Sequence, residues 1–458
     1  MQSYGFARKG LVSLAAAIAL AAATADGASA APKETILHFF QLGTSDGQTP
    51  DAGLAMDSKG NLYGTTEFGG ALNQGVAFKI SPDGKETVLH SFVGGDNDGA
   101  GPLGSLLPDK DGNLYGTTAG GGKSGKGVVF KLAPPSGGSA TDWTETLLHT
   151  FTGGGDGNQP AGALLLDKDG NLYGAAPLGG DDKTCDLNGF GPNSGCGTVF
   201  KITPDGAFSV LYAFEHVSDG DSPNGFLIAD TQGDLYGLAN GGGDDTPCPA
   251  DAFEKGCGTV FKLTPPSGSA TSWTKTTLYT FTGGSDGGLP YTGVIADSKG
   301  NLYGTTFEGG KPGCDAGEYG KGCGAVFKLA PGGTLTTLHA FTGGSDGGGP
   351  TSTLIADCKG NLYGTATLGG DLKACSGGCG TVFKITPDGA FSVLYAFKGA
   401  PNDGTVPELA GVIADSEGNL YGTTQGGGVT GGQNGLFGNG TVYKLTDTGF
   451  VTGKACSS

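Results

Sequence analysis

The stretch Gly60-Asn61-Leu62-Tyr63-Gly64 sets the fold of this chain, because its pattern recurs along almost the whole sequence. Six copies have this sequence, and one has Asp in place of Asn; they lie at 60–64, 112–116, 170–174, 233–237, 300–304, 360–364 and 418–422. The pentads begin 52 to 67 residues apart, which suits a propeller blade of four short strands with one variable loop. The repeat therefore predicts an all-β protein, a single seven-bladed β-propeller.

A second motif follows every pentad and supplies another strand. In the first repeat it is Val76-Ala77-Phe78-Lys79-Ile80, and its later copies lie at 128–132, 199–202, 260–263, 326–329, 382–385 and 442–445. We expect strand a at 54–56, strand b at 62–66, strand c at 76–80 and strand d at 86–92, with typical strand lengths of five or six residues. Successive antiparallel strands put the d–a and b–c connections on one face, here called the loop face, and the other turns on the turn face.

The a–b connection has the composition of a hairpin turn. In the first repeat it is Asp57-Ser58-Lys59-Gly60-Asn61, where Asp can accept bonds from turn amides and Gly tolerates a positive φ. The start of a calcium-binding loop is similar, but the later ligands of such a loop are absent. We therefore expect no metal at these turns.

Strand d indicates how the ring closes. The strand at 86–92 recurs around Leu148, Leu211, Leu278, Leu338 and Leu394, but no copy follows the last strand c. The seventh copy lies at the N-terminus, at 34–40. An N-terminal strand that completes the last blade removes the open sheet edges, whereas a linear solenoid would show atypical capping repeats.

The first thirty residues have the features of a secretory signal. A basic pair, Arg8 and Lys9, precedes the apolar run 11–23, and Ala28-Ser29-Ala30 offers a cleavage pattern. We expect a signal peptide at 1–30, the propeller at 31–446 and a C-terminal tail at 447–458. The expected location is extracellular, with the periplasm or the cell surface as alternatives.

Composition limits the partners of the chain. It has 458 residues, 94 of them glycine, and a formal net charge of −18. The glycines recur between apolar segments, which is typical of turns and not of disorder. Phosphate backbones require clustered Lys and Arg, and no stretch after the signal approaches the roughly 20 apolar residues that span a bilayer. We expect a monomer without a nucleic-acid partner or a membrane span.

Seven carboxylates are predicted to ring the loop face, one in each d–a connection: Asp46, Asp98, Asp156, Asp219, Asp286, Asp346 and Asp403. They could bind cations or polyols, because hard cations take oxygen ligands. Alternatively each Asp caps its own turn, and the sevenfold repetition favours this interpretation. We expect no cofactor and no metal, with calcium on this ring as the alternative.

Eight of the ten cysteines form close pairs in the b–c loops of four consecutive blades. Export permits disulfides, and zinc would require further His or Cys nearby. Cys358 in an a–b turn and Cys456 in the tail both belong to the turn face, so they are expected to pair unless one is a free or intermolecular thiol. The predicted bridges are Cys185–Cys196, Cys248–Cys257, Cys314–Cys323, Cys375–Cys379 and Cys358–Cys456.

Other candidate side chains are few. Four histidines hold one equivalent place in strand d: His38, His90, His149 and His339. Other blades have tyrosine at this place, and this exchange favours a packing role over metal binding or proton transfer. His216 stands apart on the loop face, and with Asp219 it is our candidate for acid–base chemistry, a solvated loop histidine being the alternative. The pentad tyrosines are expected in the core instead of forming a sugar-stacking platform. Phe226 is the one aromatic residue among the small residues that begin strand a, and it could line an axial pocket.

These motifs leave three functions open. The chain has no nucleophile elbow, zinc-protease helix or phosphate loop. An extracellular binding module for a glycan, polymer or protein is the leading hypothesis. A propeller lyase or hydrolase would need asymmetric carboxylates in a polar pocket, separate from the repeated turn caps. A structural role in the envelope or matrix is the third.

The linked motifs resemble a known bacterial family. The Gly-Asn-Leu-Tyr-Gly-Thr-Thr segment, its Gly-Gly continuation and the Val-Phe-Lys-Leu and Leu-His-x-Phe strands resemble the GloVer (Gloeo-Verruco) tandem repeat family over nearly all of residues 34–445. The resemblance implies a secreted or surface-displayed repeat protein without an established activity. Many relatives look as if they carry a C-terminal anchoring domain, whereas this sequence stops shortly after Cys456, which favours release. The a–b turn is more distantly similar to that of the NHL and streptogramin-lyase propellers.

Overall fold

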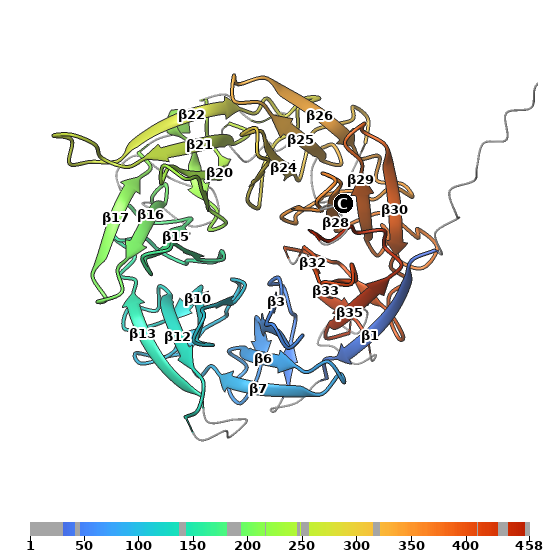
Figure 1. The fold of residues 1–458 in the computed structure, drawn as a ribbon, viewed down its shortest axis with the longest axis horizontal. Helices are drawn as coiled ribbons and strands as arrows, with labels where there is room; N and C mark the ends of the chain where they lie inside the picture. Colours follow the sequence, from blue (N-terminus) through green and yellow to red (C-terminus); the bar gives the residue numbers. More distant parts are fainter. Residues whose placement is uncertain are drawn as a thin grey trace, which may run out of the picture. The chain divides into compact units, whose positions relative to one another are not determined.

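Seven antiparallel sheets follow one another around a ring in the computed structural model, with strand d outermost in each (Figure 1). The structure describes residues 31–41, 46–136, 143–180, 194–215, 217–244, 248, 256–314, 321–409, 411–428 and 438–453. The chain is therefore a seven-bladed β-propeller, as the repeat predicts. Residues 1–30, where a signal peptide is expected, and His216 lie outside the described residues.

The blades repeat one order of strands. Blade one comprises β3 (Ala55–Met56), β4 (Leu62–Thr66), β6 (Val76–Ile80) and β7 (Glu86–Ser91). Blade two comprises β9 (Leu107–Pro108), β10 (Leu114–Thr118), β12 (Val128–Ala133) and β13 (Thr144–Thr150), and blade three β14 (Leu165–Leu166), β15 (Leu172–Ala176), β16 (Thr198–Ile202) and β17 (Phe208–Ala213). Blade four comprises β18 (Asp221–Pro223), β19 (Ile228–Ala229), β20 (Leu235–Gly241), β21 (Thr259–Thr264) and β22 (Thr274–Thr280), preceded by a 3₁₀ turn, Val217–Asp219.

The remaining blades complete the ring. Blade five comprises β23 (Ile295–Ala296), β24 (Leu302–Thr306), β25 (Ala325–Leu329) and β26 (Leu335–Ala340). Blade six comprises β27 (Ile355–Ala356), β28 (Leu362–Ala366), β29 (Thr381–Ile385) and β30 (Phe391–Ala396). Blade seven comprises β32 (Ile413–Ala414), β33 (Leu420–Thr424), β35 (Thr441–Thr446) and the N-terminal strand β1 (Lys33–Phe39).

Strand a is one residue shorter than the predicted 54–56 in blade one, where only Ala55 and Met56 pair with strand b. The general length of five or six residues expected for the strands is therefore wrong for strand a. The residues before it present carbonyl groups to the preceding blade, where the Thr65 hydroxyl donates to Gly104 O (3.2 Å) and Thr423 donates to Ala52 O (3.1 Å).

Aromatic side chains join each blade to the next. The Phe that follows strand d packs edge-to-face on the central aromatic of strand c in the next blade, with ring centroids 5.1–5.3 Å apart. Phe92 on Phe130 is one such pair, and both rings are fully buried. This contact recurs at all seven junctions, including Phe397 on Tyr443 and Phe40 on Phe78, and a buried hydrophobic cluster lies between each pair of neighbouring blades.

The two ends of the propeller meet in blade seven (Figure 1). β1 pairs antiparallel with β35, from Lys33 opposite Thr446 to Phe39 opposite Thr441. The predicted closure by an N-terminal strand is thus confirmed. Because β1 supplies strand d of the last blade, no extra strand is needed at the end of the chain.

Short sheets connect the d–a and b–c loops. β2 (Gly47–Gln48) pairs with β5 (Phe68–Gly69), β8 (Gly99–Ala100) with β11 (Gly120–Gly121), and β31 (Gly404–Thr405) with β34 (Gly426–Gly427). The glycine before strand c has a positive φ in every blade, and a Cβ on it would lie within 2.7 Å of the proline at the next junction, as at Gly75 beside Pro102. Both kinds of loop therefore share one face, as expected.

Disulfides brace the loop face. Cys248 pairs with Cys257, Cys314 with Cys323, and Cys375 with Cys379. Cys196 and Cys358 are also disulfide-bonded, whereas Cys185 and Cys456 lie outside the described residues.

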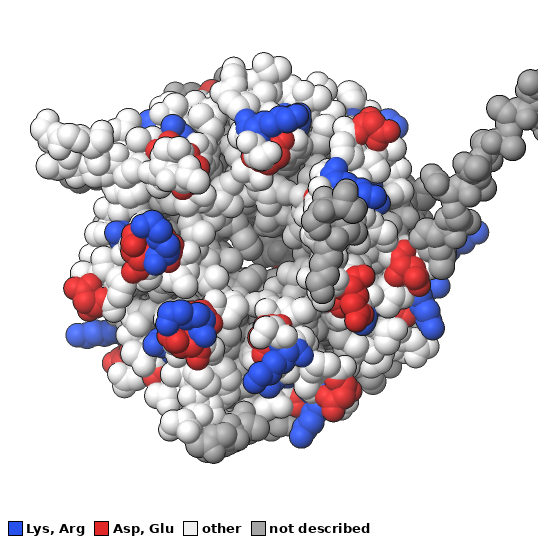
Figure 2. All heavy atoms as spheres, in the orientation of Figure 1, with Lys and Arg blue, Asp and Glu red and all other residues white. Residues whose placement is uncertain are grey.

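On the face drawn in Figure 2, acidic and basic side chains lie together in mixed clusters around the ring. No helix in the described part of the chain is long and apolar enough to cross a membrane.

Candidate functional site

The seven loop aspartates lie beside the outer strands, where each contacts a strand-d side chain. Six also accept a bond from an amide of their own loop: Asp46, Asp98, Asp156, Asp286, Asp346 and Asp403. Asp98 accepts hydrogen bonds from the amides of Val93 and Gly99, both at 2.7 Å, and its Oδ1 lies 3.2 Å from His90 Nε2. At the other junctions the strand-d partner is His38, His149, Tyr212, Tyr279, His339 or Tyr395. The strand-d histidines and tyrosines thus share one role, that of partner to the loop carboxylate.

The acid–base pair of Asp219 and His216 stays a prediction, because His216 lies outside the described residues. Asp219 accepts from Tyr212 (2.8 Å) and from Lys275 Nζ (2.7 Å). Phe226 is half-buried, and its Cβ lies only 2.4 Å from where a Cβ on Gly293 would stand. Phe226 therefore packs against the next blade.

Each pentad tyrosine packs inward and uses its hydroxyl to hold the a–b turn. Tyr63 donates to Asp57 Oδ2 (3.1 Å), and Asp57 also accepts from the amides of Lys59 and Asn61 and from the Asn61 side chain. Burial opposes ionisation of Asp57, but these hydrogen bonds outweigh it and lower its pKa. The same bond from tyrosine to the turn aspartate occurs in all seven blades.

A pocket of about 510 Å³ opens on the loop face, between blades five, six, seven and one. Its volume is typical of small-molecule sites. The lining combines carboxylates, amides, hydroxyls and aromatic rings: Gln48, Thr49, Glu67, Phe68, Asn73, Phe307, Thr367, Leu368, Val406, Glu408, Gln425, Gly426, Gly438 and Asn439.

Two positions on the loop face recur in every blade, and we call their occupants the mouth residues. One directly follows the proline of the d–a loop; the other lies five residues after the first residue of strand b, which is directly after the strand in six blades and inside β20 in blade four. Five of them line the pocket: Glu67, Phe307, Thr367, Glu408 and Gln425. The two positions lie close together, because Glu67 N donates to Thr49 O (3.0 Å), two residues before Asp51, and Phe307 N donates to Leu289 O (3.1 Å), two residues before Tyr291. From blade one to blade seven the pairs are Asp51 and Glu67, Leu103 and Ala119, Ala161 and Pro177, Asn224 and Asn240, Tyr291 and Phe307, Thr351 and Thr367, and Glu408 and Gln425.

The mouth residues are asymmetric although the blades repeat. Blades seven and one contribute three carboxyl groups, whereas blades two and three contribute only apolar side chains. Blade five contributes Tyr291 against Phe307 in an edge-to-face pair (5.3 Å), and in blade six the hydroxyls of Thr351 and Thr367 lie 2.8 Å apart. Since nothing in the propeller scaffold requires these differences, they mark a place where one blade is distinguished from another.

Burial and mutual repulsion disturb the titration of the three mouth carboxyls. The pKa of Asp51 is raised well above its usual value by burial and by the charges of Glu408 and Glu67. Burial also raises the pKa of Glu408, aided by Glu67, and that of Glu67 despite a hydrogen bond with Asp51. Asp51 is only 6% exposed, and its Oδ1 has no hydrogen-bond partner. The group can therefore hold a proton and offers both hydrogen-bond donors and acceptors.

Comparison with known proteins places the chain in a family. The family described as the Gloeobacter/Verrucomicrobia repeat matches residues 24–247 and 248–455. The chain belongs to this family. No curated protein matches it.

Solved structures with a similar fold include three enzymes. A gluconolactonase from Xanthomonas campestris has 18% identity over 72% of this chain and 85% of its own, with a TM-score of 0.40. A luciferin-regenerating enzyme has 13% identity over 92% and 97%, with a TM-score of 0.43. A family AA12 carbohydrate-active enzyme from Trichoderma reesei has 12% identity over 91% and 96%, with a TM-score of 0.40. At such identities the likeness concerns the fold alone.

The pocket of this Gloeobacter/Verrucomicrobia repeat protein also has exposed aromatic side chains beside it. Phe68, which lines the pocket, is 41% exposed, and Tyr291, which packs on the pocket residue Phe307, is 36% exposed. Thr49 and Val406 line the pocket with φ values of 59° and 58°. The residue before the d–a proline has a positive φ in every blade, so this conformation belongs to the repeated loop and not to the pocket alone.

Sequence reasoning missed the mouth residues, although the sequence contains the signal. The motifs are defined by what the repeats share, whereas the mouth positions differ in chemical character from one repeat to the next. Comparing the residue after each d–a proline, and the one after each strand b, would have found Asp51, Glu67 and Glu408.

Proposed function

We propose that this protein is an extracellular binding module that holds a saccharide in its loop-face pocket. The observation that carries the proposal is the asymmetry of the mouth residues, with carboxyls and an amide in blades seven and one and aromatic rings in blade five. Saccharides present hydroxyl groups and apolar ring faces together. A site that joins hydrogen-bonding side chains to exposed rings is suited to both.

The charge of the pocket narrows the ligand class. Among the described residues its lining includes Glu67 and Glu408 and no Lys, Arg or His, and the chain carries a net charge of −18. An acidic saccharide would be repelled on approach and within the pocket. We therefore expect neutral or amino sugars to bind in preference to uronic acids.

A glycan array followed by calorimetry tests the proposal. Phe307→Ala removes a ring and Glu408→Gln removes a charge while keeping its shape, and each should weaken binding of an array hit about tenfold or more, equivalent to about 1.4 kcal/mol. Leu372→Ala is the matched control, because Leu372 is 53% exposed on the blade-six loop and does not line the pocket. Absence of binding by the folded protein, or equal affinities in all variants, would contradict the proposal.

The carboxyls also support a second candidate, a hydrolase or lyase. Asp51, Glu67 and Glu408 have raised pKa values and belong to one group separate from the turn caps, which is the arrangement expected of a general acid and base. In that case the saccharide that binds on the array would be cleaved, and Glu408→Gln would abolish the formation of product. Binding without any turnover over prolonged incubation would exclude this candidate for that ligand.

A further inference from the structure

The residue type at one position of strand d differs from blade to blade, and this position does not line the pocket. It is the strand-d residue that pairs with the last apolar residue of strand c, as Glu86 pairs with Ile80 and Glu145 with Leu132. From blade one to blade seven its occupants are Glu86, Glu145, Phe208, Lys275, Leu335, Phe391 and Glu34. We call it the junction position, because it meets the loop aspartate and strand-d partner of the preceding blade.

Direct side-chain contacts occupy several junctions. Phe208 stacks on His149 with centroids 3.6 Å apart, and Phe391 stacks on His339 at 3.7 Å. Lys275 forms an ion pair with Asp219 at 2.7 Å. At the junction of blades six and seven, the Tyr395 hydroxyl lies 2.8 Å from carboxylate oxygens of both Glu34 and Asp403, while Glu34 Oε1 has no hydrogen-bond partner. This junction has no imidazole, so it lacks the nitrogen ligand of the triads described next.

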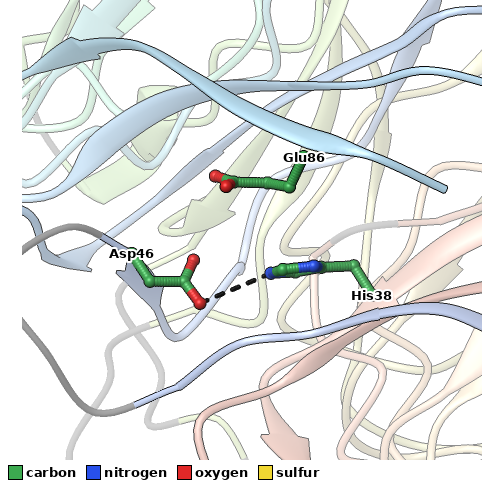
Figure 3. A group of neighbouring side chains, drawn as sticks. All are labelled: His38, Asp46 and Glu86. Carbon is green, nitrogen blue, oxygen red and sulfur yellow. Dashed lines mark ion pairs between the residues drawn. The ribbon is translucent and has the colours of Figure 1, made fainter.

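Two consecutive junctions instead bring an imidazole and two carboxyls together. His38 and Asp46 meet Glu86 between blades seven and one (Figure 3), and His90 and Asp98 meet Glu145 between blades one and two. In each triad one ligand atom from every side chain lies within 4.8 Å of the others. His38 Nε2 is 3.4 Å from Asp46 Oδ2, while His90 Nε2 is 3.2 Å from Asp98 Oδ1 and 3.8 Å from Glu145 Oε2.

The triads contain polar atoms without hydrogen bonds. His38 Nε2, Glu86 Oε1 and Glu145 Oε1 are buried atoms that lack a hydrogen-bond partner. The side chains of His90, Asp98 and Glu145 are only 20%, 9% and 12% exposed. Within the described residues, neither Asp46 nor Asp98 has a lysine partner like that of Asp219. Two carboxyls thus share one imidazole in a half-buried position, and an ion would satisfy the remaining lone pairs.

We propose that each triad binds a divalent transition-metal ion of the zinc type. One imidazole nitrogen and two carboxylate oxygens are suitable ligands, with bonds of about 2.0–2.2 Å and water in the fourth position. Bonds of that length place the ligand atoms roughly 3–4 Å apart, close to the spacing in the triads. Calcium prefers six or more oxygen ligands, which three side chains including an imidazole do not supply.

The position of the triads gives the ion a structural role. His38 belongs to β1, the strand that closes the ring, whereas Glu86 belongs to β7 of the next blade. An ion on the first triad therefore ties the closing strand to blade one, and an ion on the second ties blade one to blade two. Because ions that bind only the folded state stabilise it, loading should raise the melting temperature.

The experiment is a titration of chelator-treated full-length mature protein with zinc chloride, read by calorimetry and by metal content after gel filtration. We expect two ions per chain for the wild type. His38→Tyr and Glu145→Gln should each bind one, and the double variant should bind none. Tyrosine already occupies the position of His38 in three other blades, so this substitution suits the fold.

Glu34→Gln is the matched control. Its junction has Tyr395 in place of histidine, so this variant should still bind two ions. The thermal shift on adding zinc should diminish in the single variants and vanish in the double variant. No bound zinc in the wild type, or a stoichiometry unchanged by these substitutions, would overturn the proposal. Calcium at the same concentration should neither bind nor shift the melting temperature; equal binding of calcium would contradict the assignment to the zinc type.

Discussion

At the residue scale, carboxyl groups serve three different purposes in this propeller, and their surroundings decide which. Asp57 is held by four hydrogen bonds, which lower its pKa and make it a fixed anion at the turn. Asp51 is buried beside two other acids and has a raised pKa. Glu34, at the closing junction, is a third case, because burial and the neighbouring Asp403 raise its pKa to about 8.

Glu34 should make the protein less stable as the pH rises. Its folded-state pKa of about 8 exceeds the unfolded value near 4.5, so the folded state binds its proton more tightly. The unfolding free energy is therefore expected to fall between pH 5 and pH 8. Glu34→Gln should reduce that slope and stabilise the protein at pH 8 by roughly 1–2 kcal/mol, allowing for solvent screening.

Urea unfolding of wild type and variant at pH 5, 6.5 and 8, in metal-free buffer, measures this effect. The two proteins should differ least at pH 5, where Glu34 is protonated in the folded state. A variant that is less stable than the wild type at pH 8 would show that the Glu34 charge is favourable and that the explanation is wrong.

At the element scale, the a–b hairpin depends on its aspartate more than on its tyrosine. Asp57→Ala removes four hydrogen bonds and leaves the Tyr63 hydroxyl and two amides without their acceptor, which should cost about 2–3 kcal/mol. Tyr63→Phe removes one bond and should cost about 1 kcal/mol. Chemical denaturation of both variants measures the difference, and a Tyr63→Phe cost equal to or above that of Asp57→Ala would contradict this order.

The strands show which parts of a blade a sequence can predict. Strands b and c of blade one were predicted to the residue, at 62–66 and 76–80, since their β-branched and aromatic runs are bounded by turn residues. Strand a pairs over only Ala55 and Met56, one residue less than the predicted 54–56, and just before it Ala52 O accepts a bond from Thr423 of another blade. Such contacts between blades cannot be predicted from one repeat. The mouth carboxyls likewise come together only when closure brings Glu408 beside blade one.

At the scale of the whole molecule, the ring is held closed by β1 and by the residue that follows it. Phe40 is fully buried against Phe78 of blade one, so β1 ties blade seven to its neighbour as well as to β35. Deletion of residues 31–40 should expose the edge of β35. Loss of Phe40 alone should cost about 3–5 kcal/mol.

A variant in which the β1 segment is moved to the end of the last blade distinguishes the effect of losing ring closure from the effect of removing residues at the N-terminus. If residues 33–40 are joined after Thr446 through a copy of the Pro82-Asp83-Gly84 turn, the strand can still pair with β35 as it does in the other blades. We expect this variant to unfold cooperatively near the wild-type temperature in a calorimetric scan, and the deletion to melt lower or aggregate. Equal stability of wild type and deletion would contradict closure by β1.

The central claim, that the loop-face pocket binds a saccharide, is tested most directly by a crystal structure of the mature protein with its strongest array hit. The account predicts a sugar ring near Phe307 and Phe68, with hydroxyl groups hydrogen-bonded to Glu408, Glu67 or Gln425. A ligand found instead on the turn face or at the outer junctions, with the pocket free of it, would contradict the claim.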